Sequence, residues 1–156
     1  MVFLILISGL NKTQLSLLSF QRQQIQDVNG LIKVEKLPSL FTYRTPLKQV
    51  FQNLISNSLK YHRDGVRPQI CISVSNAGEF WQFAISDNGI GIGEEYFDKI
   101  FIIFQRLHKI EKFSGTGIGL SITKKIIESM GGSMWVQSEV AKGSTFYVTI
   151  LKNTGQ

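Results

Sequence analysis

The stretch from Thr45 to Tyr61 constrains the fold more than any other part of the chain, because its apolar residues recur at spacings of three and four. A Thr-Pro pair opens the stretch, which suits a capped helix start, and residues 62–65 end it with a glycine. This periodicity predicts a helix with one buried face, made of Leu47, Val50, Phe51, Leu54, Ile55, Ser58 and Leu59.

Alternating apolar runs and turn residues predict strands on both sides of this helix, at residues 31–34, 69–74, 79–87, 133–139 and 144–151. Further helices are expected at about 11–28 and 118–130, with a short one at about 94–104. A chain of 156 residues is one domain by size. This order of elements predicts an α+β fold: a two-layer sandwich in which a mixed, mostly antiparallel sheet packs on about three helices.

The chain divides into an apolar N-terminal segment at 1–10, a main domain at 11–152 and a tail at 153–156. The first segment is far shorter than the roughly 20 residues that span a bilayer, and it lacks the basic flank and cleavage site of a signal peptide. We interpret it as a packed strand or as the remnant of a longer chain. The single cysteine, Cys71, lies in an apolar stretch and is expected to be buried.

The net charge leaves the type of ligand open. Lysine and arginine number 17 against 11 acidic residues, a formal charge of +6. This balance suits nucleic acid, an anionic membrane or a nucleotide phosphate equally well. The basic residues are scattered rather than gathered in a stripe, and Trp81 and Trp135 lie in predicted strands, where we expect them in the core. Nucleic-acid binding is therefore not predicted.

Four polar residues border the apolar face of the predicted helix. Asn53, Asn57, Lys60 and Tyr61 fall within an arc of roughly 100° at about 100° per residue. A carboxamide oxygen is an acceptable ligand for Mg²⁺, a lysine is a point charge suited to phosphate, and a tyrosine offers a flat face to a base. The alternative is an ordinary solvated helix face.

The second candidate site follows a predicted strand, at Asp87-Asn88-Gly89-Ile90-Gly91. A carboxylate at a strand end can accept a hydrogen bond from an exocyclic amine such as that of adenine. The glycines beyond it would let the backbone approach a ligand closely. The alternative is a simple turn, which Asp-Asn-Gly also favours.

A third candidate site, Gly115-Thr116-Gly117-Ile118-Gly119-Leu120, leads into the predicted helix at 118–130. Backbone N–H groups at a helix start attract phosphate, and glycines leave room for it. The run fits neither the dinucleotide fingerprint, because no strand precedes it, nor the P-loop, because no Gly-Lys-Ser/Thr follows. The interpretation left open is that the run binds phosphate in a fold other than these two.

In this order, the stretches resemble the histidine-kinase branch of the superfamily that also contains gyrase, the ninety-kilodalton heat-shock chaperone and the MutL repair proteins. Residues 53–61 resemble the family's asparagine box, 87–91 its first glycine box and 115–120 its second. Two further segments match: 100–106 resembles the phenylalanine box and 143–146 the small glycine motif of the last hairpin. The run 104–108 looks most like kinases attached to phytochrome-type light sensors.

The resemblance implies the family's ATP-binding sandwich, the Bergerat fold, with ATP and Mg²⁺ as cofactors. Asp87 would bind the adenine amine, and Tyr61 would pack near the base. Asn57 would hold Mg²⁺ with Asn53 supporting it, and Lys60 would meet the phosphates.

The resemblance also implies a lid over the nucleotide, formed by residues 93–117. Arg106 would approach the γ-phosphate from this lid, and Phe101 and Phe104 would anchor it, although both also suit an ordinary core. The nucleotide-binding set is completed by Gly89, Gly91, Gly115, Thr116, Gly117, Gly119 and Leu120.

One position separates the branches of the superfamily. The hydrolases carry a glutamate four residues before the Mg²⁺-binding asparagine, as a base for the attacking water. Asn53 stands there in this chain and cannot take a proton near neutral pH, so phosphate is expected to go to a histidine instead. The family's acceptor histidine precedes an acidic residue, whereas His62 precedes Arg63 and His108 precedes Lys109. The acceptor is therefore expected on a separate domain.

The resemblance thus implies a sensor histidine kinase catalytic domain that donates the γ-phosphate of ATP to a histidine on a separate helical phosphoacceptor domain, with a response regulator downstream. The alternative is a non-catalytic nucleotide-binding or docking module from a truncated kinase. A serine kinase of the anti-sigma type is disfavoured by Asn53. We expect a cytoplasmic location without membrane contact by this domain, whether the parent kinase is membrane-attached or soluble.

Overall fold

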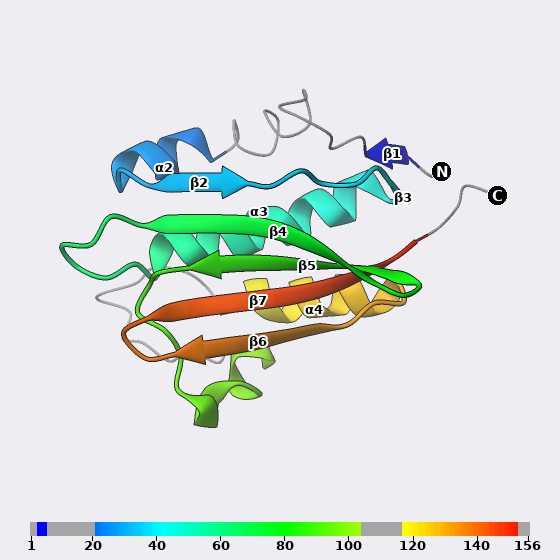
Figure 1. Ribbon diagram of the computed structural model, residues 1–156. Coiled ribbons are helices and arrows are strands. Elements are labelled where there is room, and N and C mark those ends of the chain that lie inside the picture. The colour runs from blue at the N-terminus through cyan, green and yellow to red at the C-terminus, as the bar shows by residue number, and fades with distance from the viewer. Residues whose placement is uncertain (1–2, 6–20, 104–116, 153–156) are drawn as a thin grey trace.

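A five-stranded mixed sheet forms one layer of the protein (Figure 1). The computed structural model describes residues 3–5, 21–103 and 117–152. The strand order is β2-β4-β5-β7-β6, in which β2 pairs with β4 in parallel and every other pair is antiparallel, as predicted. The strands are β2 (Leu31–Val34), β4 (Gln69–Ala77), β5 (Phe80–Asp87), β6 (Met134–Glu139) and β7 (Gly143–Leu151).

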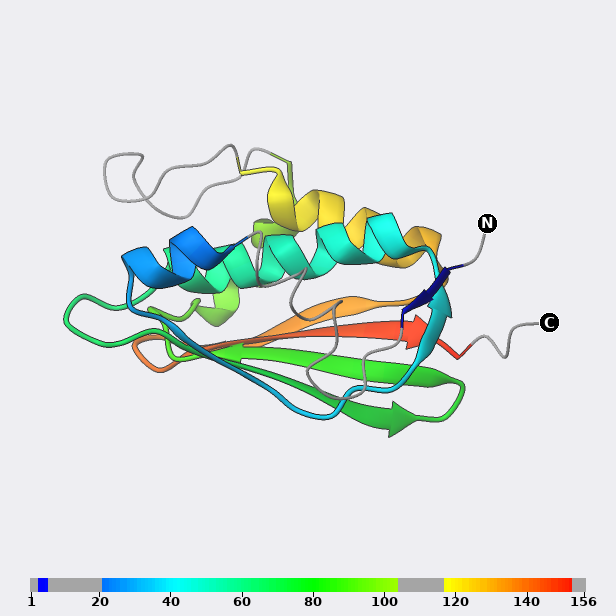
Figure 2. The same ribbon diagram turned by 90° about the horizontal axis from the view of Figure 1, so that it is seen from above.

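The helices form the second layer and lie on one face of the sheet, as the view in Figure 2 shows. They are α2 (Arg22–Asp27), α3 (Arg44–Lys60) and α4 (Gly119–Ser129). Two 3₁₀ turns, η1 (Glu94–Tyr96) and η2 (Lys99–Phe101), lie between β5 and α4 in the chain. A separate two-stranded antiparallel sheet joins β1 (Phe3–Ile5) to β3 (Leu40–Thr42). The two-layer α+β prediction is confirmed.

The core lies between α3 and the sheet. All seven residues predicted for the buried face of the helix are buried, and the face includes the polar side chain of Ser58, which is 4% exposed. Phe51 of α3 meets Phe83 of β5 edge to face, with ring centroids 5.5 Å apart. Each fully buried side chain of this size contributes about 1.5–3 kcal/mol relative to an exposed one. This packing fixes α3 across the sheet.

Only one face of each strand contributes to this core, because side chains alternate along a strand. Ile70 and Ile72 are buried, and Cys71 between them is half-buried on the other face, so its expected burial is wrong. Trp135 is also half-buried and stacks on Tyr147 with ring centroids 5.2 Å apart, so it is not a core residue. Whether a strand residue faces the core is decided by the alternation of side chains along the strand. The apolar character of the residue does not decide it.

Several predicted boundaries differ from the structure. Helix α3 begins at Arg44, and its N-cap residue is Tyr43, which makes no side-chain cap hydrogen bond; the Thr45 cap was therefore wrong. Pro46 still lies in the first turn, where a missing N–H costs nothing. The helix expected at about 94–104 is instead the pair of 3₁₀ turns, as far as residue 103.

The predicted helix at about 11–28 is described only from residue 21, and its last part is α2, which ends before Asn29, a residue with φ of 51°. The strand β3 was not predicted, because three residues are too few to show a period. In the part of the chain that the structure describes, no helix combines the length and apolarity needed to cross a bilayer.

Candidate functional site

The carboxylate of Asp87 lies at the end of β5 and accepts hydrogen bonds from three directions. Its Oδ1 accepts from the backbone N–H of Gly89 at 2.9 Å and from that of Ser144, on β7, at 3.2 Å. Its Oδ2 accepts from the Ser58 hydroxyl of α3 at 3.1 Å. Three elements therefore meet at one carboxylate.

The environment of Asp87 acts on its charge in two opposing ways. Burial raises the pKa of the Asp87 carboxyl above its ordinary value, because a buried site disfavours the charged form. The hydrogen bonds from Gly89, Ser144 and Ser58 lower the pKa, but burial is the larger effect. Pairing of polar groups at this depth is what makes a buried carboxylate tolerable.

Glycines let the loops behind Asp87 close on one another. A Cβ on Gly89 would lie 2.4 Å from the carbonyl oxygen of Tyr61, and a Cβ on Gly143 would lie 1.9 Å from that of Asp87. Gly91 has φ of 72°, and its Cβ would lie 2.1 Å from the carbonyl oxygen of Glu139. Gly89 and Gly91 were expected to let the backbone approach a ligand, which stays a prediction; the structure adds that all three glycines are required by contact with the protein's own backbone.

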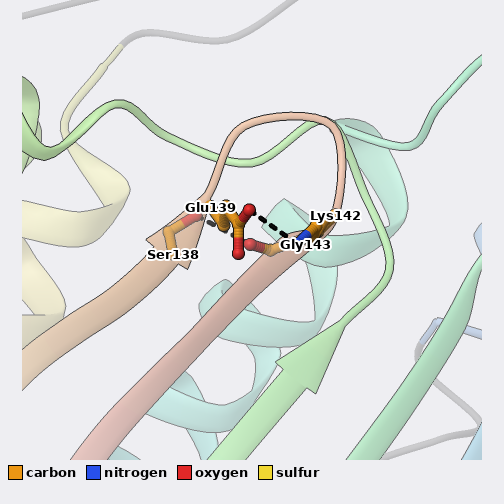
Figure 3. Close-up of polar contacts among 4 residues, drawn as sticks. All are labelled: Ser138, Glu139, Lys142 and Gly143. Carbon is orange, nitrogen blue, oxygen red and sulfur yellow. Dashed lines mark hydrogen bonds and ion pairs between the residues drawn. The ribbon is translucent and has the colours of Figure 1, made fainter.

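The turn between β6 and β7 sets the position of the Ser144 N–H. Ser138 donates its hydroxyl hydrogen to the carbonyl oxygen of Gly143 at 2.8 Å, and Glu139 forms an ion pair with Lys142 at 2.7 Å (Figure 3). The Ser138 hydroxyl also accepts from the N–H of Ile92 at 2.8 Å. The turn is thereby tied to the chain that follows Asp87.

Asn53 connects α3 to the start of α4. Its Nδ2 donates to Oγ1 of Thr123 at 3.1 Å and lies 3.4 Å from the carbonyl oxygen of Gly119. Thr123 is fully buried, and its hydroxyl donates to the same Gly119 carbonyl at 2.8 Å. The carboxamide thus holds the third predicted site against the first.

The remaining residues of the helix seam lie at the C-terminal end of α3. Asn57 is half-buried, and among the described residues its side chain makes no hydrogen bond. Lys60 places its ammonium group 4.9 Å from the centre of the Tyr61 ring. The ammonium group and the aromatic ring are therefore adjacent, and Asn57 lies one turn earlier on the same helix.

Ile118, the N-cap residue of α4, makes no side-chain capping hydrogen bond to any described residue. The first N–H groups of an α-helix have no partner within the helix, so they are available to an anion. Gly117 has φ of 75°, and a Cβ on Gly119 would meet no described atom within 4 Å. Packing therefore does not explain Gly119, in contrast to the glycines behind Asp87. Leu120 packs against the core.

The three predicted sites lie together in the structure. Ser58 and Asp87 join the first to the second across 29 positions of sequence, and Asn53 and Thr123 join the first to the third across 70. Arg106, Gly115 and Thr116 lie outside the described residues, as do Phe104 and His108. Phe101 packs against the core, with the Lys124 ammonium 4.7 Å from its ring centre.

Sequence reasoning missed several polar partners. Ser58 was assigned to the buried face with no polar role, and neither Thr123 nor Ser144 was singled out. A hydrogen bond to the turn after Asp87 was also missed: Arg63 donates through Nε to the carbonyl oxygen of Asn88 at 2.9 Å. A hydroxyl on an otherwise apolar helix face was the one available signal for Ser58.

The described residues contain no group of three or more histidine, cysteine, aspartate or glutamate side chains able to hold a metal ion. A magnesium ion bound chiefly by a ligand's phosphates needs only one or two protein oxygens, and the unengaged Asn57 carboxamide fits that role. His62 donates through Nδ1 to the carbonyl oxygen of Leu59 at 2.7 Å, so it terminates α3.

Comparison with known proteins gives concordant results. Residues 42–154 match the model of a family described as histidine kinase-, DNA gyrase B- and HSP90-like ATPases. Cyanobacterial phytochrome A of Nostoc sp. is 46% identical over 129 residues, and the phytochrome-like protein Cph1 of Synechocystis sp. is 44% identical over the same length. Each match covers 83% of this chain but only 17% of the relative.

Solved structures agree with the fold. The catalytic domain of the histidine kinase ThkA has a TM-score of 0.78 and 26% identity, and the match covers 97% of this chain and 96% of that one. Full-length ShkA in complex with AMPPNP also has a TM-score of 0.78, at 22% identity, over 96% of this chain and 30% of that chain. ThkA in complex with the response regulator TrrA matches with a TM-score of 0.72, at 24% identity, over 97% of this chain and 42% of that chain.

Proposed function

Because the chain belongs to the family of histidine kinase-, DNA gyrase B- and HSP90-like ATPases, we propose that it is the ATP-binding catalytic domain of a sensor histidine kinase. It would bind ATP with Mg²⁺ and donate the γ-phosphate to a histidine on a separate helical phosphoacceptor domain. The single observation that supports this is that α3 contacts both other candidate segments: Ser58 binds the Asp87 carboxylate, and Asn53 contacts Gly119 and Thr123 of α4.

The adenine end of the proposed site is Asp87. A half-buried carboxylate with an unfilled acceptor position suits the exocyclic amine of adenine, and a base with an oxygen there would set two acceptors against each other. Tyr61 would pack near the base, since the N–H of Ile90 donates to its carbonyl oxygen at 3.0 Å and so holds it beside the Asp87 turn.

The phosphate end of the proposed site is the start of α4. The N–H groups there would bind phosphate oxygens; Gly119 leaves room for them, and Gly117 with its φ of 75° is expected to line them as well. Lys60 would supply a point charge, and Asn57 would supply a carboxamide oxygen to Mg²⁺. The ion would neutralise charge on the phosphates during transfer. Arg106, Gly115 and Thr116 complete the proposed set by resemblance alone.

The chemistry of Asn53 favours transfer over hydrolysis. Its carboxamide cannot take a proton near neutral pH, and its Nδ2 is engaged with Thr123. Water attack therefore lacks a base at this position. Phosphoryl transfer instead needs an incoming nucleophile, which we propose is the imidazole of a partner histidine; its attack breaks the bond to the ADP oxygen and forms a P–N bond.

The proposed partners are a phosphoacceptor domain and, after it, a response regulator, consistent with the complex of ThkA and TrrA. Because ATP is the substrate, we place the domain in the cytoplasm. Nucleic acid is not a proposed partner.

Phosphotransfer to a supplied acceptor domain tests the function. The chain is mixed with a family phosphoacceptor domain and γ-labelled ATP, and acid-labile phosphohistidine is measured on the acceptor. We expect labelling with the native chain and none with Asp87→Asn. ATP binding without labelling would support a non-catalytic nucleotide-binding or docking module, and acid-stable phosphoserine would support a serine kinase.

A further inference from the structure

The acceptor capacity of the Asp87 carboxylate is almost full before any ligand arrives. An ionised carboxylate has about four lone-pair positions, two on each oxygen. Gly89 and Ser144 occupy both positions on Oδ1. Ser58 occupies one of the two on Oδ2. Among the described residues there is no further donor to this carboxylate, so one position is left, on the oxygen that Ser58 contacts.

This count has a consequence for the ligand. A single N–H donor, such as one of the two hydrogens of an adenine amine, fills the remaining position and leaves the carboxylate fully paired. The Ser58 hydroxyl and the ligand must then share Oδ2, so the hydroxyl limits where the donor can approach. Loss of the hydroxyl would open a second position on that oxygen.

Ser58 is also placed to hold the carboxylate still. It is 4% exposed and belongs to α3, whose neighbouring residues are fixed in the core. Its hydroxyl is the only side-chain donor to Asp87 among the described residues, the others being backbone N–H groups. A buried side chain on a packed helix keeps its hydrogen bond in one geometry.

We propose that Ser58 is a positioning residue for nucleotide recognition: its hydroxyl holds Oδ2 of Asp87 and leaves one acceptor position for the amine of the base. This inference rests on the proposed function. Ser58 acts through Asp87 and need not touch the nucleotide. A hydrogen bond to the charged form should also keep the carboxyl ionised, since burial acts in the opposite direction.

The charged groups around Asp87 do not replace this hydrogen bond. Arg63, which follows α3, donates to the carbonyl oxygen of Asn88, and Lys60 lies over the Tyr61 ring. On the β6–β7 turn, Lys142 and Glu139 pair with each other and are mostly exposed. Burial and the three hydrogen bonds account for the shifted pKa of Asp87, and no ion pair contributes.

The test compares Ser58→Ala with Ser86→Ala. Ser86 precedes Asp87, and its hydroxyl bonds to that of Thr145 at 2.9 Å, so the control loses one serine hydroxyl without touching the carboxylate. The first measurement is the titration of the Asp87 carboxyl carbon by NMR without nucleotide. The second is calorimetric ATP affinity as a function of pH.

We expect Ser58→Ala to raise the pKa of Asp87 further, and Ser86→Ala to leave it unchanged. ATP affinity at neutral pH should fall about three- to tenfold in Ser58→Ala only, and the acid-side loss of affinity should begin at a higher pH. Ser58→Cys has a similar volume and a weak S–H donor, so its Asp87 pKa and its ATP affinity should lie between those of the native protein and Ser58→Ala. It replaces the alanine variant in the test if that variant is unstable.

An unchanged Asp87 titration in Ser58→Ala and Ser58→Cys would overturn the proposal, whatever happens to ATP. An equal shift in Ser86→Ala would do the same. If the native chain fails to bind ATP while the titration shifts as expected, the proposed function fails, and the role of Ser58 in holding the carboxylate stands.

Discussion

Asn53 of α3 donates a hydrogen bond of 3.1 Å to Oγ1 of Thr123 in α4, 70 positions later in the chain. Thr123 is fully buried, and its hydroxyl donates a hydrogen bond to the carbonyl oxygen of Gly119, in the first turn of the same helix. Asn53 therefore holds the proposed phosphate-binding helix start in place. Its role in this structure is that of a connection between helices.

The Asn53–Thr123 pair should show energetic coupling. Asn53→Ala and Thr123→Val should each lower the free energy of unfolding by about 0.5–1.5 kcal/mol, because each leaves its partner, the buried Thr123 or the half-buried Asn53, short of a hydrogen bond. The double variant should lose less than the sum, since the second change removes a group that the first has already left unpaired. Urea unfolding of all four proteins measures this. Strict additivity would show that the hydrogen bond contributes nothing.

Asp87→Asn should separate binding from stability. The carboxamide brings a donor to the position that must accept the adenine amine, so ATP affinity should fall by about 1–3 kcal/mol or more. The fold should persist, because the amide oxygen can still accept from Gly89 and Ser144 and the Ser58 hydroxyl can accept from Nδ2. Calorimetric titration with ATP tests the expected loss of affinity, and unfolding in urea tests the expected persistence of the fold. Unchanged ATP affinity would refute the adenine assignment.

The same variant gives a prediction for pH. Folding raises the pKa of Asp87, so the folded state binds the proton more tightly than the unfolded state. The native protein therefore gains stability from this group as pH falls through the raised folded-state pKa toward the ordinary pKa of the unfolded state, and loses that gain as pH rises back through the folded-state pKa. The free energy of unfolding of Asp87→Asn should match or exceed that of the native protein at neutral pH. The difference in its favour should become smaller in acid. An advantage that grows in acid would contradict the burial of a charged form.

Asn57→Ala should remove the benefit of Mg²⁺. With a non-hydrolysable ATP analogue, native affinity should rise when Mg²⁺ is added, and this gain should fall by at least about tenfold in the variant. Affinity without the metal should change little. Asn76→Ala, which removes a carboxamide on β4 that contacts Lys152, is the control. An equal Mg²⁺ effect in native and variant proteins would exclude Asn57 as a ligand.

Two glycines should respond oppositely to alanine. Gly119 has room for a Cβ and lies in a helix, so Gly119→Ala should raise stability by up to about 1 kcal/mol while weakening ATP binding. Gly143 has φ of 130°, and its Cβ would lie 1.9 Å from the carbonyl oxygen of Asp87, so Gly143→Ala should cost at least about 2 kcal/mol. Thermal unfolding and ATP titration of both variants decide. Full ATP affinity in Gly119→Ala would remove that glycine from the proposed site.

Most of the fold could be predicted from local sequence patterns. The spacing of apolar residues in α3 identified its buried face correctly, because a helix repeats every 3.6 residues whatever surrounds it. The prediction failed where the signal was short or ambiguous: β3 has three residues, and the segment near residue 94 forms 3₁₀ turns instead of a helix. Cys71 was misplaced because an apolar run in a strand does not say which alternate residues face the core.

The sequence predicts which residues form the candidate site, and their roles in binding stay predictions; it did not predict the hydrogen bonds that connect them. Asn53, Asn57, Lys60, Tyr61 and Asp87 were identified from residue type and spacing, and the structure places them on neighbouring elements. The sequence did not show a second reason for the glycines: Gly89, Gly91 and Gly143 lie against backbone carbonyls of the protein itself. Crowding of this kind depends on how distant loops meet, and no local period records it.

The amino-acid order by itself determined the helices, most strands and the kinds of chemical group at the site, because propensity and periodicity act over a few residues. Only the tertiary structure decided which groups are partners: Ser58 with Asp87, Asn53 with Thr123, and Ser144 with Asp87. These pairs form because the strand order β4-β5-β7 and the packing of α3 on the sheet bring separate segments within hydrogen-bond distance. A hydrogen bond requires a separation near 3 Å, and such separations between distant segments are set by the packed core.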